Sequence, residues 1–462
     1  MNVLLVATYE LGRQPFGVAS PAAWLRREGC RVSCVDLAVE RLHEEAVVTA
    51  DLIAFHLPMH TATRLAARVV GKVRAINPGA HLCFYGLYAP GNADYLRKLG
   101  GQTILGGEFE EGLLALVRRL ASKGVRGSGP RGDGQPEAVI SLSRQQFLSP
   151  DRSGLPGLGH YAHLHMGHDD LRAVGYTEAS RGCRHLCRHC PIVPIYEGTF
   201  RIVQREVVLA DVRQQVEAGA RHITFGDPDF LNGPKHAVAI VQDLHREFVD
   251  LTYDVTIKIE HILKYRESLP VLRDTGCLFI TSAVEAVDDR VLEILHKGHT
   301  RAGFEKAVEL CREARVRLNP TFVTFTPWIS REGYLDLLQA ILDLDLVDHV
   351  APIQYAIRLL IPAGSKLLEL PEVRAIVGPF QDEKLIYPWV HSDARVDGLY
   401  AEVLCAVQEG QRLHEDRRGI LQRVWRLARA AVDRGAGEGL AMAELDRIPR
   451  AAVPYLTEPW YC

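Results

Sequence analysis

The chain has 462 residues, a formal net charge of −3 at pH 7, and a composition that is 47% hydrophobic and 24% charged. This length allows about two or three globular domains with full hydrophobic cores. The near-balanced charge gives no basic surface for nucleic acid or for an anionic membrane, so we expect neither as a partner. No run approaches the roughly 18 apolar residues of a membrane span. Residues 1–6 lack the basic flank and cleavage site of a signal peptide.

The ten cysteines are not spaced as a disulfide framework. Five of them fall in strand-like apolar runs or on the apolar face of a predicted helix: Cys30, Cys34, Cys83, Cys277 and Cys311. We expect packed thiols at these positions, because free cysteine is among the most buried residue types. The expected compartment is therefore the reducing cytoplasm.

Residues 1–121 alternate strand-like and helix-like segments and form the first predicted domain. We expect strands over residues 3–8, 31–37, 52–56, 81–85 and 102–105, with helices that include 21–28 and 110–120. Apolar strands joined by helices indicate a doubly wound, flavodoxin-like parallel sheet, which is an α/β fold. Such sheets bind ligands at the carboxyl ends of their strands. Here those ends carry residues 9–17, 57–63, 86–90 and 106–108.

Residues 122–172 form a predicted linker. Its first part, residues 122–136, is rich in Gly, Ser and Pro, which favour turns and irregular structure. Its second part holds four histidines, namely His160, His163, His165 and His168. Four histidines could bind a metal, but their irregular spacing favours a solvated loop.

Residues 173–370 form a predicted partial (βα)6 barrel. Six strands are expected over residues 175–180, 222–225, 253–259, 278–282, 318–325 and 350–357, with helices between them at 207–218, 238–248, 289–295, 304–314 and 334–342. Chemistry in such a barrel lies at the carboxyl ends of the strands. A helical extension is expected over residues 371–462, with an arginine-rich, solvated face at Arg417, Arg418, Arg423, Arg426 and Arg429.

Cys183, Cys187 and Cys190 follow the first predicted barrel strand with the spacing C-x3-C-x2-C. Three thiolates can hold three corners of a 4Fe-4S cluster and leave the fourth iron open for a ligand. Two alternatives remain open: a structural zinc site completed by His185 or His189, and inert buried thiols. A second C-x2-C knuckle, common in structural zinc sites, is absent from the sequence.

This motif and its place after the first barrel strand resemble the radical S-adenosylmethionine (radical SAM) superfamily. The resemblance implies that the open iron binds S-adenosylmethionine, and that one electron from the cluster cleaves it to a 5′-deoxyadenosyl radical. It also implies an electron donor such as flavodoxin or ferredoxin as a partner. His189 departs from the family pattern, in which an aromatic hydrocarbon side chain usually precedes the third cysteine.

Later barrel segments supply further candidates for S-adenosylmethionine binding. Gly226, Asp227 and Asp229 resemble the family's acidic motif after the second strand, and Glu285 resembles a glutamate that follows the fourth. An acidic segment can receive the ligand's ammonium group, with Asp227 the first choice and Asp229 the second. The alternative for this segment is a helix N-cap turn. We expect Lys297 to be a solvated cation at a helix end.

The first domain resembles the cobalamin-binding domain found in one branch of the superfamily. The tentative cobalamin contacts that the resemblance implies are Phe16, Gly86, Gly106, Gly107 and Glu108. A D-x-H-x-x-G motif is absent, and that branch often leaves the lower cobalt face without a protein ligand. A degenerate sheet domain without cobalamin is the alternative.

The resemblance implies a cobalamin-dependent methyltransferase that acts on an unactivated carbon of a small-molecule or peptide substrate. The alternatives are radical rearrangement, cyclisation or oxidation without methyl transfer, and, from another class, a structural zinc-binding protein. A methylthiotransferase is disfavoured because the first domain lacks a second cysteine triad. The sequence ends at Cys462, and two alternatives remain open: a selenocysteine codon read as a stop, as the resemblance to members with Cys-Cys-Ala-Glu-Pro-type tails implies, and a frayed tail that ends in a chance cysteine.

Overall fold

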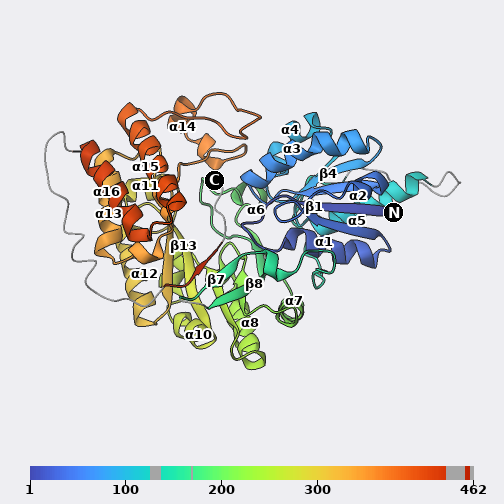
Figure 1. Cartoon of the computed structure of the whole chain (residues 1–462), viewed down its shortest axis with the longest axis horizontal. Coiled ribbons are helices and arrows are strands. Elements are labelled where there is room, and N and C mark those ends of the chain that lie inside the picture. Colours follow the sequence, from blue (N-terminus) through green and yellow to red (C-terminus); the bar gives the residue numbers. More distant parts are fainter. Residues whose placement is uncertain (125–136, 168–169, 433–452, 458–462) are drawn as a thin grey trace.

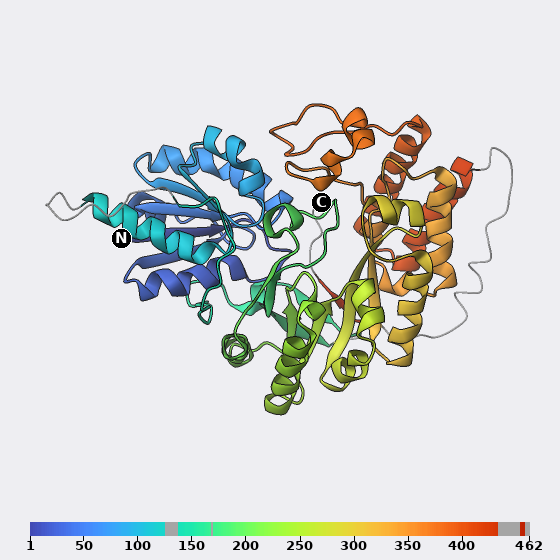
Figure 2. The ribbon, with the colours of Figure 1, turned by 180° about the vertical axis from the view of Figure 1, so that it is seen from behind.

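The computed structural model describes residues 1–124, 137–167, 170–432 and 453–457. An N-terminal α/β domain lies beside a larger part that contains the second sheet and the C-terminal helices (Figure 1), and the view from behind shows the same arrangement (Figure 2). Within the described residues, no helix is both long and apolar enough to cross a membrane. His168 and the predicted tail at Cys462 lie outside the described residues, as does most of the predicted linker 122–136.

The N-terminal domain is built on a six-stranded parallel sheet. Its strands lie in the order β2 (Arg31–Asp36), β1 (Asn2–Ala7), β3 (Leu52–His56), β4 (His81–Tyr85), β5 (Thr103–Gly107) and β6 (Ile140–Ser141). One face packs on α1 (Phe16–Arg27) and α5 (Phe109–Gly124), and the other packs on α2 (Glu44–Thr49), α3 (His60–Ile76) and α4 (Ala93–Lys98). Because both faces are buried, the strands are continuous apolar runs. The predicted doubly wound sheet is confirmed.

Helix α1 starts five residues before its predicted start, so that Pro21 lies inside the helix. Proline has no backbone N–H to donate to the carbonyl four residues earlier, which here belongs to Gly17. The Tyr85 hydroxyl instead donates to the Gly17 carbonyl at 2.9 Å. The sheet thus satisfies the acceptor that Pro21 leaves free, and the helix continues through the proline.

The second sheet is a curled half-barrel of seven strands. Their order is β14 (Arg317–Phe322), β13 (Cys277–Glu285), β12 (Thr252–Thr256), β11 (His222–Phe225), β8 (Leu171–Thr177), β7 (His163–His165) and β15 (Tyr455–Leu456). The pairs from β8 to β14 are parallel, whereas β7 and β15 are antiparallel additions. The histidines at 163 and 165 therefore lie in a strand, which corrects the predicted loop.

Helices cover the outside of this half-barrel, and all five predicted ones are present. They are α7 (Arg205–Glu217), α8 (Pro234–Glu247), α11 (Asp289–Ile294), α12 (Arg301–Glu313) and α13 (Arg331–Asp343), together with the short helices α9 (Ile259–Lys264) and α10 (Ser268–Asp274). Their apolar faces share one large core with the strands, except that α11 packs on a separate cluster formed with residues 359–389. This core holds the carboxyl ends of the parallel strands at one edge.

The sixth predicted barrel strand, residues 350–357, is wrong. The chain forms a 3-10 helix, Pro352–Ala356, and then a single parallel bridge between Phe325 and Arg358. Pro352 lacks a backbone donor. The Gln354 side chain accepts a hydrogen bond from the Phe322 backbone N–H at 2.9 Å, in the place of a neighbouring strand. The parallel part of the sheet therefore has five strands rather than six.

The C-terminal part contains α14 (Pro371–Ile376), α15 (Ala394–Arg412) and α16 (Arg417–Val432). The predicted solvated arginine face of α16 needs correction. Arg417 donates to the Asp348 carbonyl, and Arg418 forms an ion pair with the Asp348 carboxylate at 2.8 Å. Two of these arginines thus attach α16 to the barrel.

Candidate functional site

The cysteine motif lies on a loop between β9 (Ser180–Gly182) and α6 (Val193–Tyr196), at the carboxyl end of the half-barrel. Backbone contacts hold this loop from two sides. The Arg188 N–H donates to the Leu295 carbonyl at 3.0 Å, and the Arg184 N–H donates to the Asn232 side chain at 3.3 Å. The ends of α11 and β11 therefore fix the shape of the loop.

The three motif thiols lie in a poorly hydrated environment. Cys187 is buried, and Cys183 and Cys190 are partly buried. Burial raises the pKa of Cys183 to about 11 and the pKa of Cys190 to about 12. Metals bind the thiolate form, so a cation at this position would also supply the charge that keeps these sulfurs deprotonated.

The two histidines of the motif point to carboxylates and not to the thiols. His185 Nε2 lies 3.3 Å from Asp229, and His189 Nε2 lies 3.1 Å from Glu285. Neither imidazole of the motif is therefore aimed at the thiols as the fourth ligand of a zinc site.

Asp227 is buried and binds the chain next to the cysteine loop. Its carboxylate accepts hydrogen bonds from the Ala179 N–H at 2.9 Å and from the Ser180 hydroxyl at 2.5 Å. Burial raises its pKa to about 7 despite these two donors. Gly226, just before it, packs so closely under Tyr176 that a Cβ would lie 1.8 Å from the phenol oxygen. Both residues thus shape the segment after β11.

Asp229 forms the N-cap of a short 3-10 helix, Phe230–Asn232, where its Oδ1 accepts from the Leu231 N–H at 3.1 Å. The cap turn weighed for this segment is therefore present. Its other oxygen, Oδ2, lies 2.8 Å from His261 Nδ1 and 3.3 Å from His185 Nε2. Burial would raise the pKa of Asp229, but the two histidines lower it below its usual value.

Glu285 ends β13 with a left-handed backbone, φ 71°, which turns its carboxylate toward the cysteine loop. Lys297 Nζ lies 3.2 Å from this carboxylate. Burial alone would raise the pKa of Glu285, but Lys297 and His189 outweigh it and lower the pKa to about 2. Lys297 is only 3% exposed, so the expectation of a solvated helix-end cation is wrong. The negative charges of Glu285, Cys187 and Cys190 raise its pKa against the effect of burial.

A cavity of about 300 Å³ lies between the N-terminal sheet and the half-barrel. Phe16 and Gly107 line it, as two of the predicted cobalamin contacts. The other three lie elsewhere: a Cβ at Gly86 would contact the Leu57 carbonyl, one at Gly106 would contact the Pro90 ring, and Glu108 is fully buried in an ion-pair network. Their roles in the structure are packing and charge pairing.

Sequence reasoning missed several residues of this cavity. Glu10 and His56 lie at its wall and form an ion pair of 2.5 Å between Oε1 and Nδ1. Tyr176 and Glu178 line the cavity from the end of β8. Glu10 follows β1 and His56 is the last residue of β3, and many ligand-binding residues of doubly wound sheets lie at such strand ends. That position was the signal available in the sequence.

A second cavity, of about 230 Å³, occupies the inside of the half-barrel. Polar side chains on the inner faces of successive strands line it: Thr224, Asp254, Thr256, Thr281, Asn319 and Thr321. Leu11, Arg13 and Gly226 line both this cavity and the one beneath the N-terminal sheet. The two cavities therefore meet at shared walls.

Solved structures with similar folds place this architecture among known ones. One is the cobalamin-dependent S-adenosylmethionine radical enzyme OxsB, with a TM-score of 0.70, 13% identity, and coverage of 88% of this chain and 67% of that one. Another is the radical S-adenosylmethionine methyltransferase TsrM from Kitasatospora setae, with a TM-score of 0.62, 16% identity, and coverage of 82% and 78%. At these identities the likeness shows a shared fold.

Sequence comparison points the same way. The chain is 22% identical over 350 residues to the hopanoid C-3 methylase of Methylococcus capsulatus, a match that covers 73% of this chain and 66% of that protein. It is 23% identical over 184 residues to a tRNA-2-methylthio-N(6)-dimethylallyladenosine synthase of Vibrio vulnificus, of which it covers 39%. The chain thus spans less than two thirds of either relative. Residues 177–340 match the family model of the radical SAM superfamily.

Proposed function

We propose that the chain is a radical SAM enzyme in which Cys183, Cys187 and Cys190 hold a 4Fe-4S cluster with one open iron. When bound, a reduced cluster supplies the electron that cleaves S-adenosylmethionine to a 5′-deoxyadenosyl radical. The chain's own contribution is to hold the loop in place through Arg184 and Arg188 and to surround it with a charged shell. Lys297, buried beside Cys187 and Cys190, would offset the negative charge of the thiolates.

The proposed site for S-adenosylmethionine lies between Gly226–Asp229 and Glu285. Because the Asp227 and Asp229 carboxylates already face partners within the chain, we propose that this segment serves the ligand's ammonium group through its backbone carbonyls. Glu285 is ionised and faces the loop, so it can receive a hydroxyl or ammonium group of the ligand. An electron donor such as flavodoxin or ferredoxin would supply the electron.

The proposed second cofactor is cobalamin, held in the cavity under the N-terminal sheet. Support comes from the position of this cavity at the carboxyl ends of the strands, with Phe16, Gly107, Glu10 and His56 in its wall. The likeness to OxsB and TsrM supports it further, since both are described as cobalamin-bound. With both cofactors present, we propose methyl transfer to an unactivated carbon.

The substrate proposed for the half-barrel cavity is a small polar molecule or a short peptide segment. The cavity's wall of threonines, Asp254 and Asn319 offers hydroxyl, carboxylate and amide groups, which favour a polar ligand although Thr224 and Asp254 also hydrogen-bond each other. The single observation that carries the whole proposal is that this cavity meets the cofactor cavity at Leu11, Arg13 and Gly226. A substrate bound there would lie beside the proposed cobalamin cavity and beside Gly226 of the proposed S-adenosylmethionine segment.

Anaerobic reconstitution tests the proposal. The wild-type chain should bind about four irons and four sulfides, bind cobalamin, and form 5′-deoxyadenosine together with S-adenosylhomocysteine. Cys187→Ala should lose the cluster and all turnover, whereas Cys405→Ala, at an exposed thiol, should retain both. A single zinc without turnover would refute the proposal. Formation of 5′-deoxyadenosine without S-adenosylhomocysteine would instead support radical chemistry without methyl transfer.

A further inference from the structure

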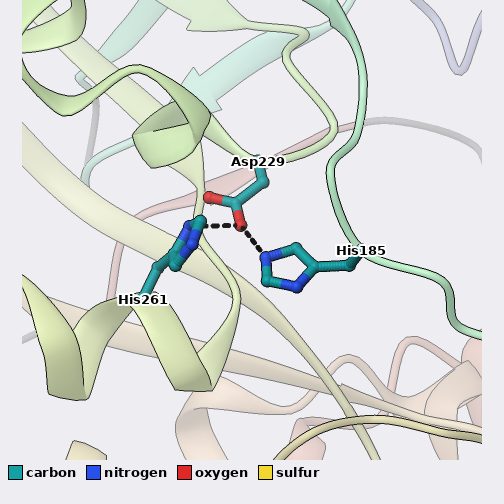
Figure 3. A group of neighbouring side chains, drawn as sticks. All are labelled: His185, Asp229 and His261. Carbon is teal, nitrogen blue, oxygen red and sulfur yellow. Dashed lines mark ion pairs between the residues drawn. The ribbon is translucent and has the colours of Figure 1, made fainter. Parts of the chain in front are cut away.

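Three side chains from distant parts of the chain meet at one point beside the cysteine loop (Figure 3). His185 comes from the loop itself, Asp229 follows β11, and His261 lies in α9. Both histidines point to the same carboxylate oxygen: His261 Nδ1 lies 2.8 Å from Asp229 Oδ2, and His185 Nε2 lies 3.3 Å from it. The three atoms lie within 4.8 Å of one another.

These three atoms face one another at ion-pair distance, but without acceptable hydrogen-bond geometry. His185 Nε2, Asp229 Oδ2 and His261 Nδ1 are each buried, and each lacks a partner with acceptable hydrogen-bond geometry. His261 and Asp229 are each only 1% exposed, so bulk solvent does not reach these atoms. Buried polar atoms in folded proteins are nearly always satisfied. Three unsatisfied atoms that converge on one point therefore indicate a missing shared partner.

A divalent metal ion fits that position. Two imidazole nitrogens and a carboxylate oxygen form a donor set that suits zinc or ferrous iron. With metal–ligand bonds of about 2.0–2.1 Å, tetrahedral donors lie about 3.4 Å apart. The observed separations of 2.8 and 3.3 Å are close to this value, so small side-chain rotations would complete the site.

The surroundings of His185 also suit a ligand. Its second nitrogen, Nδ1, lies 3.5 Å from Glu260 Oε2. A carboxylate at the distal nitrogen of a ligating histidine holds the proton there and leaves the other nitrogen free for the metal. Glu260 in turn lies 3.4 Å from Lys258 Nζ. This arrangement resembles the outer shell of known histidine–metal sites.

We propose that His185 Nε2, Asp229 Oδ2 and His261 Nδ1 bind one divalent transition-metal ion, zinc or ferrous iron. Three protein ligands leave at least one coordination position open. The site goes beyond the proposed cluster and does not use its cysteines. Because His185 lies two residues from both Cys183 and Cys187, bound metal would join the cysteine loop to the ends of β11 and α9.

The test uses the full chain with Cys183, Cys187 and Cys190 all changed to alanine, which cannot assemble the cluster. After removal of metal by a chelator, Co²⁺ is titrated in and followed by its visible absorption, and bound Zn²⁺ is counted by mass spectrometry of the elements. We expect one equivalent of either ion, a rise in the thermal unfolding midpoint, and no thiolate-to-metal charge-transfer band.

Three further variants are made in this triple-alanine background: His185→Asn, Asp229→Asn and His261→Asn. Each should lose more Co²⁺ affinity than Glu260→Gln, because each removes a proposed metal ligand. Glu260→Gln should weaken binding by about 10–100-fold. The matched control is His43→Asn, since His43 lies 3.3 Å from Glu40 but is more than half exposed, and it should bind as tightly as its parent. Circular dichroism checks that each variant is folded.

Two results would overturn the proposal. One is substoichiometric binding by the triple-alanine variant. The other is unchanged Co²⁺ affinity in folded Asp229→Asn and His261→Asn, in which case the role of Asp229 is the helix cap alone. Because the triple-alanine variant has no cluster, failure of this test and failure of the proposed radical chemistry are separate outcomes.

Discussion

Replacement of Arg181 by methionine should strongly destabilise the contact between the two parts of the chain. The Arg181 guanidinium extends from β9 and lies 2.7 Å from Glu110, 2.8 Å from Glu178 and 3.3 Å from Glu108. Glu108 and Glu110 belong to the N-terminal domain and are fully buried. The methylene chain of methionine fills much of the same space, so the change removes the charge while it keeps most of the packing.

The expected loss in the free energy of unfolding is about 3–5 kcal/mol, which is typical when one partner of a buried ion pair is removed. The carboxylates that remain are then buried without a cation. A matched control is Arg118→Met, which breaks a doubly hydrogen-bonded pair with Glu28 at the surface, where Arg118 is 61% exposed. Exposed pairs contribute about 0–1 kcal/mol, so this variant should differ little from wild type.

The difference in the free energy of unfolding between the wild type and Arg181→Met should shrink as the pH falls. In the wild type, burial acts to raise the pKa of Glu110 but Arg181 holds it below its usual value of 4.5, so this pairing stabilises the fold above that pH and is lost as the pH falls through the folded-state pKa. In Arg181→Met, hydrogen bonds from Ser20, Gln145 and Tyr196 remain, but the loss of the cation lets burial raise the carboxyl pKa values. The variant therefore takes up protons on folding and loses stability as the pH rises.

Urea unfolding followed by circular dichroism at pH 8 and pH 5 measures both effects. The reasoning fails if Arg181→Met loses less than about 1 kcal/mol relative to Arg118→Met, or if its deficit is the same at both pH values. The double variant with Glu110→Gln should recover part of the loss, because it removes one uncompensated buried charge.

Three further predictions concern the site and its support. Lys297→Met should shift the midpoint potential of a bound cluster to more negative values, because a buried positive charge near Cys187 and Cys190 is lost. A redox titration followed by electron paramagnetic resonance measures this potential. Lys297→Arg should restore the wild-type potential. Gly17→Ala should destabilise by about 1–3 kcal/mol, because its Cβ would lie 1.9 Å from the His56 ring. Gly71→Ala, in the open surface of α3, should instead stabilise by about 0.5–1 kcal/mol in the same urea assay. Equal effects of the two glycine changes, or an unchanged potential, would contradict these arguments.

Elements with a strong local signal could be predicted from the sequence. Strands β3, β4 and β11 have their predicted bounds, because each is an apolar run between polar residues. Helix α3 was missed, since it begins after Met59, which provides no side-chain cap. The false strand at 350–357 and the predicted start of α1, which is five residues too late, have a different cause. In both cases a hydrogen bond joins residues far apart in the sequence: the Gln354 side chain accepts from the Phe322 N–H, and the Tyr85 hydroxyl donates to the Gly17 carbonyl.

The cysteines of the site could be predicted because their spacing is local, whereas the partners of its charges could not. Lys297 lies 12 positions after Glu285 at a helix end, a position at which the sequence predicts a solvated cation. Only the fold brings it to a buried carboxylate. His299 likewise lies in a helix-end turn, yet both of its ring nitrogens are buried and unsatisfied, and burial lowers its pKa to about 4.

The two histidines within the cysteine motif connect these observations. His185 turns to Asp229 at the end of β11, and His189 turns to Glu285 at the end of β13, so the loop is attached on both sides to ends of parallel strands. Neither ring is then available to complete a zinc site with the motif thiols. The departure of His189 from the family pattern thus has a physical reason. Its imidazole is a second basic group beside the Glu285 carboxylate, whose pKa Lys297 already lowers. A loop attached in this way presents its cysteines without using its histidines, which is what a cluster with one open iron requires.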